Sequence, residues 1–353
     1  MKKSFILLCL AAWVAAGCDK AADAPGPDSE LSVSLAGLPD SRGTKSTAGT
    51  AAENQVGNLT LFVFDTGGML DVSHACTPAE IEARRATLRT RTGVKTVYAV
   101  ANMAPAIAAR ADAVVRRPDL DAVTYSLSDI GPASLLMRGV ADGVQVAAEA
   151  GGSTTVALAR GVSRVALGLV RNSLPAPYGT VRVRHAFLCN AVGNQNLAGD
   201  AEPVPERYVN QEATRGHVRN QVIGTGAVEA ECKELTFRTL GDELASGVTK
   251  TWDQCFFYAF PNALTTPNSG YHTTFVPTAT VLMVVVAIQG TDYYYPVPLS
   301  GGLQANTEYR VELTLSGLGN TEDDPFARIE KADLSATISV SPWTTGDAVI
   351  ETI

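Results

Sequence analysis

The chain has 353 residues, of which 18% are charged, and its formal net charge is −8. A chain of this length is larger than one β-sandwich usually needs, so we expect two domains of ordinary size behind a leader. The acidic balance excludes a nucleic-acid-binding protein, because phosphate binding requires clustered Lys and Arg.

The chain opens with an export signal. The segment MKKSFILLCLAAWVAAGC runs from two lysines through an apolar stretch to small residues before Cys18. Its apolar stretch is shorter than the ~20 residues that cross a bilayer as a helix. The small residues resemble a bacterial lipobox, which predicts a signal peptide over residues 1–17 and a lipidated Cys18 at the outer membrane. Ordinary secretion with an unmodified Cys18 is the alternative.

Residues 18–42 predict a tether, one short strand and a polar loop. DKAADAPGPDSE lacks apolar periodicity, which is typical of a flexible tether. Leu31, Val33 and Leu35 then alternate with small residues, mostly serine, and this is the pattern of a strand with one buried face. The loop that follows is rich in Ser, Gly and Thr, and proteolytic nicking concentrates in such loops. A protease can therefore separate this strand from the rest of the chain.

Residues 43–160 predict a domain that mixes strands with short helices. NLTLFVFDTGGML indicates a strand buried on both faces that ends in a tight turn, and GVKTVYAVANM indicates a second strand. TPAEIEARRATL begins with Pro78 and acidic residues, which favours a short helix. The Ala- and Arg-rich run from Ala104 to Leu120 also favours a helix, and two further strands are expected around Gly151-Gly152.

Residues 161–353 predict a second domain in which strand follows strand. Gly, Pro, Asn and Asp separate short apolar runs, as in antiparallel sandwiches. The run from Val281 to Ile288 is too short for a membrane span and favours a central strand. The chain ends with TTGDAVIETI after Trp343. These residues are suited to supply one more strand, and its candidate members are Ala348, Val349, Ile350, Thr352 and Ile353.

The sequence offers no constellation for catalysis, a cofactor or a metal. It has neither a Gly-x-Ser-x-Gly elbow nor an HExxH motif, and its four histidines stand singly without any CxxC. We therefore expect no enzyme activity, no cofactor and no metal site. In an oxidising compartment, Cys76, Cys189, Cys232 and Cys255 allow three disulfide connectivities, and the sequence does not choose among them.

One aromatic cluster keeps a different function open. Tyr293, Tyr294 and Tyr295 have the chemistry to stack on sugar rings, but they also suit a strand before Pro296. Packing within a sheet is the favoured interpretation. A surface glycan-binding lipoprotein is the alternative, and it requires these rings to be exposed.

These segments together resemble the fimbrillins, the shaft subunits of the type V pili of Bacteroides-related bacteria. The resemblance rests on the leader with Cys18, on NLTLFVFDTGGML and TGVKTVYAVANM, on ARGVSRVALGLV, and on NTEYRVELTLSGLGNTEDDPF with ATISVSPW. It implies a mostly β fold of two transthyretin-like antiparallel β-sandwich domains with a few short helices.

The resemblance also implies how such a protein matures and what it binds. An arginine-specific protease cuts the surface lipoprotein, here between Arg42 and Gly43, and releases the strand with Leu31, Val33 and Leu35. The C-terminal strand of a neighbouring copy then takes its place. The implied partners are copies of the chain in a surface pilus, accessory anchor and tip subunits, and ligands on host or bacterial surfaces. An anchor or tip subunit of the same pilus is the alternative role.

Overall fold

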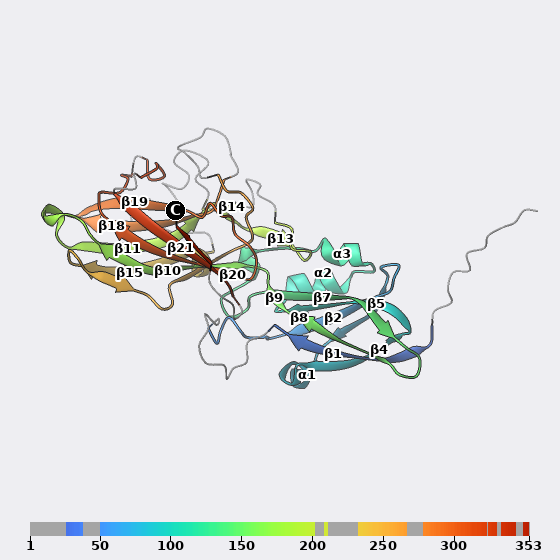
Figure 1. Cartoon of the computed structure of the whole chain (residues 1–353). Helices are drawn as coiled ribbons and strands as arrows, with labels where there is room; N and C mark the ends of the chain where they lie inside the picture. Colours follow the sequence, from blue (N-terminus) through green and yellow to red (C-terminus); the bar gives the residue numbers. More distant parts are fainter. Residues whose placement is uncertain are drawn as a thin grey trace, which may run out of the picture.

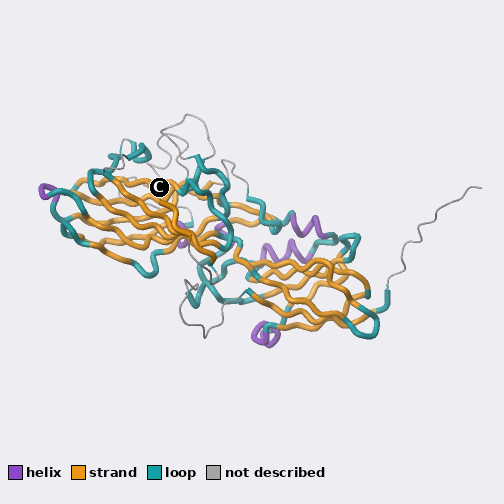
Figure 2. Tube along the Cα trace, viewed as in Figure 1, coloured by secondary structure: helices purple, strands orange, loops and turns teal. Residues whose placement is uncertain are grey.

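The computed structural model describes residues 26–37, 50–201, 208–210, 232–266, 278–322, 324–329, 333–343 and 349–352. Its strands gather into two groups that lie side by side and meet near β9 (Ala159–Arg160) and β13 (Asn194–Asn196), as Figures 1 and 2 show. Strands dominate the chain, so the predicted mostly β fold is confirmed. In the described part of the chain, none of the helices combines the length and apolar character of a membrane span.

The first group consists of two sheets. The three-stranded sheet has the order β4 (Arg85–Arg91), β1 (Asp28–Ala36), β8 (Gly152–Ala157). The five-stranded sheet has the order β3 (Leu70–Ala75), β2 (Leu59–Phe64), β5 (Gly93–Ala101), β7 (Met137–Val146), β9. Apolar side chains of both sheets form one buried cluster between them.

The five-stranded sheet is buried on both faces. Leu59, Leu61 and Val63 of β2 point into the cluster between the sheets, whereas Phe62 and Phe64 belong to the core on the other side. That second face is covered by α2 (Pro105–Asp112) and α3 (Arg117–Asp121), as Figure 1 shows. The absence of polar alternation in LTLFVF has its physical reason here, since water reaches neither face of the strand.

The helices of this group are shorter than the sequence predicts. α1 (Pro78–Ala83) ends at Arg84, whose φ of 52° is left-handed, and β4 begins at the next residue. Ala86 and Leu88 alternate with exposed residues in β4 and are buried in the cluster, so packing overrides the helix propensity of this segment. The expected helix from Ala104 to Leu120 is likewise divided into α2 and α3.

The second group also consists of two sheets. In the larger one, β16 (Thr249–Thr251), β10 (Ser163–Asn172), β20 (Thr307–Leu315), β21 (Leu334–Pro342) and β22 (Val349–Thr352) follow in this order, and β17 (Phe256–Ala259) also pairs with β10. The other has the order β15 (Phe237–Leu244), β11 (Val181–Cys189), β18 (Val281–Ile288), β19 (Thr291–Pro298). β18 is thus a central strand, as expected.

Short elements complete the chain, and one pair links the two groups. These elements are β6 (Thr124–Ser126), η1 (Leu127–Asp129), η2 (Ala176–Tyr178), β12 (Ala191–Val192), β14 (Tyr208–Val209) and α5 (Lys233–Thr236). β12 pairs with β14, and β6 pairs with β13. Because β6 precedes β9 and β13 follows β10 in sequence, the β6–β13 pair joins the groups by backbone hydrogen bonds.

Among the described residues, most strand pairs are antiparallel, and two are parallel. β1 runs parallel to β8, and β10 runs parallel to β20. Parallel neighbours cannot be joined by a hairpin and need a long connection. Both pairs join strands that are far apart in sequence, so neither was visible in local sequence patterns.

The tyrosine cluster is built into the sheets. Tyr294 is 4% exposed and Tyr295 is fully buried, while Tyr293 packs against the core at its edge. The Tyr295 hydroxyl donates to the Gly317 carbonyl at 3.0 Å. These rings are therefore occupied with packing, which removes the observation on which the glycan-binding alternative depends.

Candidate assembly site around the first strand

β1 is the middle strand of its sheet, although it lies at the start of the chain. It runs antiparallel to β4 from Asp28↔Arg91 to Ser34↔Arg85, and parallel to β8 from Leu31↔Gly152 to Ala36↔Ala157. Figure 1 shows β1 between these two neighbours. Both backbone edges of β1 are therefore occupied within one sheet.

The inner face of β1 is apolar and closes the space between the two sheets. Leu31 and Val33 are fully buried, and Leu35 packs at the edge of the same cluster. The opposite face is polar, and the Ser32 hydroxyl accepts a hydrogen bond from Arg85 Nε at 2.9 Å. The alternation of the sequence thus corresponds to a buried and a solvent-facing side.

Both ends of β1 are held by further hydrogen bonds. The Ser29 hydroxyl donates to the Ala147 carbonyl at 2.7 Å, and Leu158 N donates to the Ala36 carbonyl at 2.9 Å. Gly37 ends the strand with a φ of +80°, and a side-chain carbon there would lie 2.4 Å from the Leu158 carbonyl oxygen. This close approach explains why a glycine follows the strand.

Removal of β1 would open a groove. β4 and β8 pair with β1 and lie on opposite sides of it in the strand order, so each would gain an unpaired backbone edge. The floor of the groove would consist of apolar residues such as Val97, Ala99 and Val144 of the opposite sheet. Such a groove fits an extended segment with alternating apolar residues.

Asp71 of β3 ties β4, one wall of this groove, to the opposite sheet. Its carboxylate accepts hydrogen bonds from the Thr90 hydroxyl at 2.6 Å, Arg91 N at 3.0 Å and Lys95 Nζ at 2.8 Å. Burial alone would raise the pKa of Asp71, but the bonds from Lys95, Thr90 and Arg91 outweigh it and hold this pKa below its ordinary value. The tie does not involve β1, so it would remain if β1 were removed.

We expect Asp71→Asn to lower the free energy of unfolding by about 2 kcal/mol at neutral pH, because a hydrogen bond to a charged group contributes about 1.5–3 kcal/mol. A lowered pKa in the folded state gives stability that is present above the ordinary pKa and is lost as pH falls through the folded pKa. Urea denaturation should therefore show the gap to the unchanged protein narrowing in acid. Asp112→Asn, at an exposed position of α2, is the control. A gap that stays constant with pH would contradict this role.

The other predicted site residues lie elsewhere. Cys18, Arg42, Gly43, Ala348 and Ile353 fall outside the described residues. Val349, Ile350 and Thr352 belong to β22, which pairs with β21 from Val349↔Val340 to Thr352↔Thr337. The C-terminal strand thus lies at the end of a strand order in the second group, not beside β1 of its own chain (Figure 1).

A buried charged cluster, which the sequence hardly indicates, joins both ends of the body. The Glu53 carboxylate is almost fully buried and accepts hydrogen bonds from Arg164 Nη1 at 2.8 Å and from the Tyr258 hydroxyl at 2.5 Å. Arg164 also pairs with Glu308. Trp343 stacks on Tyr258, and the Arg164 guanidinium carbon lies 4.7 Å from its ring centroid. This cluster, Glu53–Arg164–Glu308 with Tyr258 and Trp343, is here named the anchor cluster.

The anchor cluster contains residues from near both ends. Glu53 follows β1 by fewer than twenty residues in the sequence, and Trp343 is the last described residue before β22. Arg160 adds a second cation, since its guanidinium carbon lies 4.5 Å from the Trp343 ring centroid and its Nε donates to the Glu53 carbonyl at 3.3 Å. An arginine in the apolar run VSRVALGLV was the one signal in the sequence, because a charge in a buried strand requires a partner.

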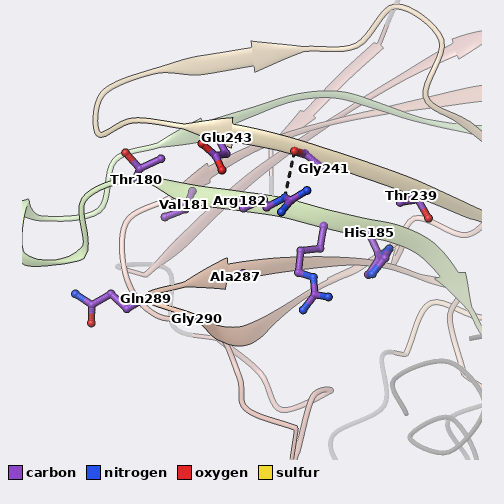
Figure 3. A pocket seen from close by; sticks show the side chains of 11 residues that line it. Thr180, Val181, Arg182, His185, Thr239, Gly241, Glu243, Ala287, Gln289 and Gly290 are labelled. Carbon is purple, nitrogen blue, oxygen red and sulfur yellow. Dashed lines mark hydrogen bonds between the residues drawn. The ribbon is translucent and has the colours of Figure 1, made fainter. Parts of the chain in front are cut away.

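A hollow of about 650 Å³ lies on the face formed by β11, β15 and β18 (Figure 3). Its cationic side chains already have partners. Arg182 Nε donates to the Gly241 carbonyl at 3.3 Å, and Arg184 pairs with Asp292 at 2.7 Å. Burial and the neighbouring Arg184 lower the pKa of His185. The hollow therefore has no free cationic group among these residues with which to select an anion.

Comparison with known proteins gives one family match and a set of similar structures. The family model "Major fimbrial subunit protein (FimA)" matches residues 29–169, which extend from β1 into β10. No curated protein matches the sequence.

The solved structures are similar over nearly the whole of both chains. A candidate cell adhesion protein from Parabacteroides distasonis has 19% identity and a TM-score of 0.62, with 90% of this chain and 99% of that chain covered. One from Bacteroides eggerthii has 21% identity and a TM-score of 0.61, with 91% and 97% covered. A fimbrilin from Porphyromonas gingivalis has 12% identity and a TM-score of 0.55, with 90% and 98% covered. At these identities the similarity shows a common fold.

Proposed function

We propose that this chain is the shaft subunit of a surface pilus that polymerises by strand exchange, because the model of the major fimbrial subunit family matches residues 29–169, which include β1. The family consists of structural, non-enzymatic subunits. In this proposal a protease removes β1, and the C-terminal strand of a neighbouring copy occupies the groove between β4 and β8. The observation that carries the proposal is that β1, at the very start of the body, is a central strand with a buried apolar face.

The energetics of β1 explain why a covalent cut would be needed. Full burial of an apolar side chain contributes about 1.5–3 kcal/mol, and a hydrogen bond about 1 kcal/mol net. Leu31, Val33 and two hydrogen-bonded edges therefore hold β1 firmly. While β1 is connected to the body, its effective concentration excludes any competing strand. After cleavage, β1 and the body are separate chains, so β1 loses its high effective concentration. Once it dissociates it is diluted into the surroundings, and another strand can bind in its place.

The proposed cut lies between Arg42 and Gly43, in the Ser-, Gly- and Thr-rich segment of the sequence between β1 and Glu53. Lipidated Cys18 would hold the precursor at the outer membrane until an arginine-specific protease cuts this segment. After the cut, residues 43–353 would remain one chain. The segment around Glu53 would stay bound to the body, because the Glu53 carboxylate is hydrogen-bonded within the anchor cluster. The proposal also includes accessory anchor and tip subunits of the pilus, and ligands on host or bacterial surfaces, as partners of this chain.

Replacing Arg42 with alanine should keep the chain uncut and prevent polymerisation. In the unchanged protein, mass spectrometry of sheared surface fibres should find a chain that begins at Gly43, within detergent-resistant ladders. Lys45→Ala is the matched control, because it removes a neighbouring basic residue of the same loop. Ladders built from chains that still begin at Cys18 would contradict the shaft assignment and favour an anchor subunit.

The same assay tests the donor strand. A chain that lacks residues 344–353 should be exported, folded and cut, because the anchor cluster and both sheets of the first group lie before this segment. It should form no ladders, because it lacks the proposed donor strand. Persistent ladders would show that the donor lies elsewhere in the chain.

A further inference from the structure

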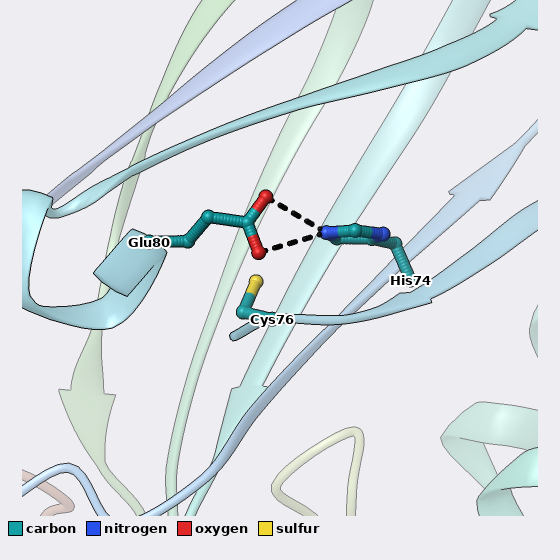
Figure 4. Close-up of side chains that lie close together, drawn as sticks. All are labelled: His74, Cys76 and Glu80. Carbon is teal, nitrogen blue, oxygen red and sulfur yellow. Dashed lines mark hydrogen bonds and ion pairs between the residues drawn. The ribbon is translucent and has the colours of Figure 1, made fainter. Parts of the chain in front are cut away.

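Three side chains with metal-binding chemistry meet beside the first group of strands. His74 and Cys76 come from β3 and the residue after it, and Glu80 comes from α1 (Figure 4). One ligand atom of each lies within 4.8 Å of the others. His74 Nε2 is 3.0 Å from Glu80 Oε1. Cys76 forms no disulfide within the described part of the chain.

The spacing is close to that of a tetrahedral zinc site. Bonds of about 2.0–2.2 Å to nitrogen and oxygen and about 2.3 Å to sulfur place neighbouring ligand atoms roughly 3.3–3.6 Å apart. The pair of His74 Nε2 and Glu80 Oε1 is already near this separation. Since all three ligand atoms lie within 4.8 Å of one another, the Cys76 sulfur would need to approach by at most about 1.2 Å, which a rotation about its Cα–Cβ bond can supply.

The carboxylate is fixed before any metal arrives. Glu80 Oε2 accepts hydrogen bonds from Thr77 N at 2.7 Å and from the Thr77 hydroxyl at 2.9 Å. Glu80 N in turn donates to Thr77 Oγ1 at 3.3 Å, which completes the capping box of α1. Such bonds behind a ligand orient it toward the metal, as in established metal sites. Both carboxylate oxygens also face His74 Nε2, Oε1 at 3.0 Å and Oε2 at 3.2 Å, as Figure 4 shows.

We propose that His74, Cys76 and Glu80 bind one zinc ion, with a water molecule as the fourth ligand. Thiolate, imidazole and carboxylate are the ligands that zinc takes, whereas calcium and magnesium prefer sites built from oxygen atoms alone. The His74 and Glu80 side chains are 29% and 23% exposed, so the ion can enter from solvent and keep a water. Binding replaces the His74–Glu80 hydrogen bond: the Nε2 proton of His74 is lost to solvent, the neutral ring keeps its proton on Nδ1, and the thiol proton of Cys76 also passes to solvent.

The site would fasten a wall of the groove. α1 leads through Arg84 directly into β4, and β3 belongs to the opposite sheet. A zinc ion would therefore join the two sheets at one end of β4, while Asp71 joins them farther along the strand. This inference goes beyond the proposed function, because metal binding requires neither cleavage nor polymerisation.

Cobalt(II) titrated into the uncut protein tests the site by its absorption spectrum. A tetrahedral thiolate site should give thiolate-to-cobalt charge transfer and intense ligand-field bands, saturate at one ion per chain, and lose both on addition of zinc. Cys76→Ser should abolish the charge-transfer band. Glu82→Gln, an exposed carboxylate of the same helix, should leave the spectrum and affinity unchanged.

Two further variants keep the test decisive if Cys76→Ser does not fold. His74→Gln and Glu80→Gln retain the thiol and should each weaken cobalt binding about tenfold or more. Zinc should also raise the unfolding temperature of the unchanged protein in a concentration-dependent way. A band that persists without Cys76, or no band at saturating cobalt, would overturn the proposal, as would equal weakening in Glu82→Gln.

Discussion

Replacing Leu31 with alanine should lower the free energy of unfolding of the uncut precursor by about 2–5 kcal/mol. Leu31 is fully buried in the middle of β1, and truncation leaves a cavity between the two sheets. The cut and assembled protein should be unaffected, since β1 is no longer part of it. Chemical denaturation of both forms measures the two values.

Ser34→Ala is the matched control for Leu31→Ala, because Ser34 lies on the solvent-facing side of the same strand. A surface change of this kind should shift stability by no more than about 0.5 kcal/mol. An equal loss of stability in the precursor and in the assembled protein would show that β1 stays in place after cleavage. That result would contradict strand exchange while leaving the fold intact.

Replacing Glu53 with glutamine should destabilise the precursor and the cut protein alike, by about 3 kcal/mol. Removal of one partner of a buried ion pair leaves the other charge in a medium of low dielectric constant, which costs about 3–5 kcal/mol. Arg164 keeps Glu308 as its second partner, so we expect the lower end of this range. Trp343 stacks on Tyr258 within the anchor cluster, and its fluorescence should report the local change.

Glu312→Gln is the control for Glu53→Gln, because its partly exposed carboxylate lies 3.7 Å from Arg310 on the same strand and surface pairs contribute little. Cleavage should distinguish the two substitutions. In the cut protein, Leu31→Ala should no longer lower the free energy of unfolding, whereas Glu53→Gln should still lower it. A Glu53→Gln effect that also vanishes would show that the segment around Glu53 leaves with β1.

The sequence correctly predicted those elements whose local pattern of apolar residues is typical of only one kind of secondary structure. The alternation of Leu31, Val33 and Leu35 indicates a strand, and the apolar run from Val281 to Ile288 indicates a central one. The first residues of β4 were predicted as part of a short helix, because that segment begins with Pro78 and acidic residues; the burial of β4 depends on a strand far away in sequence. The parallel pairing of β1 with β8 could not be predicted from local sequence, because these two strands are also far apart in the chain.

The site residues that the sequence did not reveal depend on distant contacts or on a combination of residue types. Glu53 stands in a polar linker, and nothing near it indicates that Arg164 and Tyr258 bury it. His74, Cys76 and Glu80 are close in sequence, and their spacing was available. His74 and Cys76 were each judged by residue type alone and Glu80 only as an acidic residue at the start of a helix, so the chemistry of the set became apparent only when the turn before α1 brought the three together.

The different places of β1 and β22 have a mechanical consequence. A strand with neighbours on both sides resists a pull along its axis in shear, because all its hydrogen bonds carry the load together. β22 is the last strand of its sheet and can peel away from β21 one bond at a time. A tail would therefore detach from its own subunit under a weak force and, in the place of β1, withstand a strong one. In such a fibre, the force that frees a C-terminal strand from its own subunit would be smaller than the force that pulls the same strand out of a neighbouring subunit.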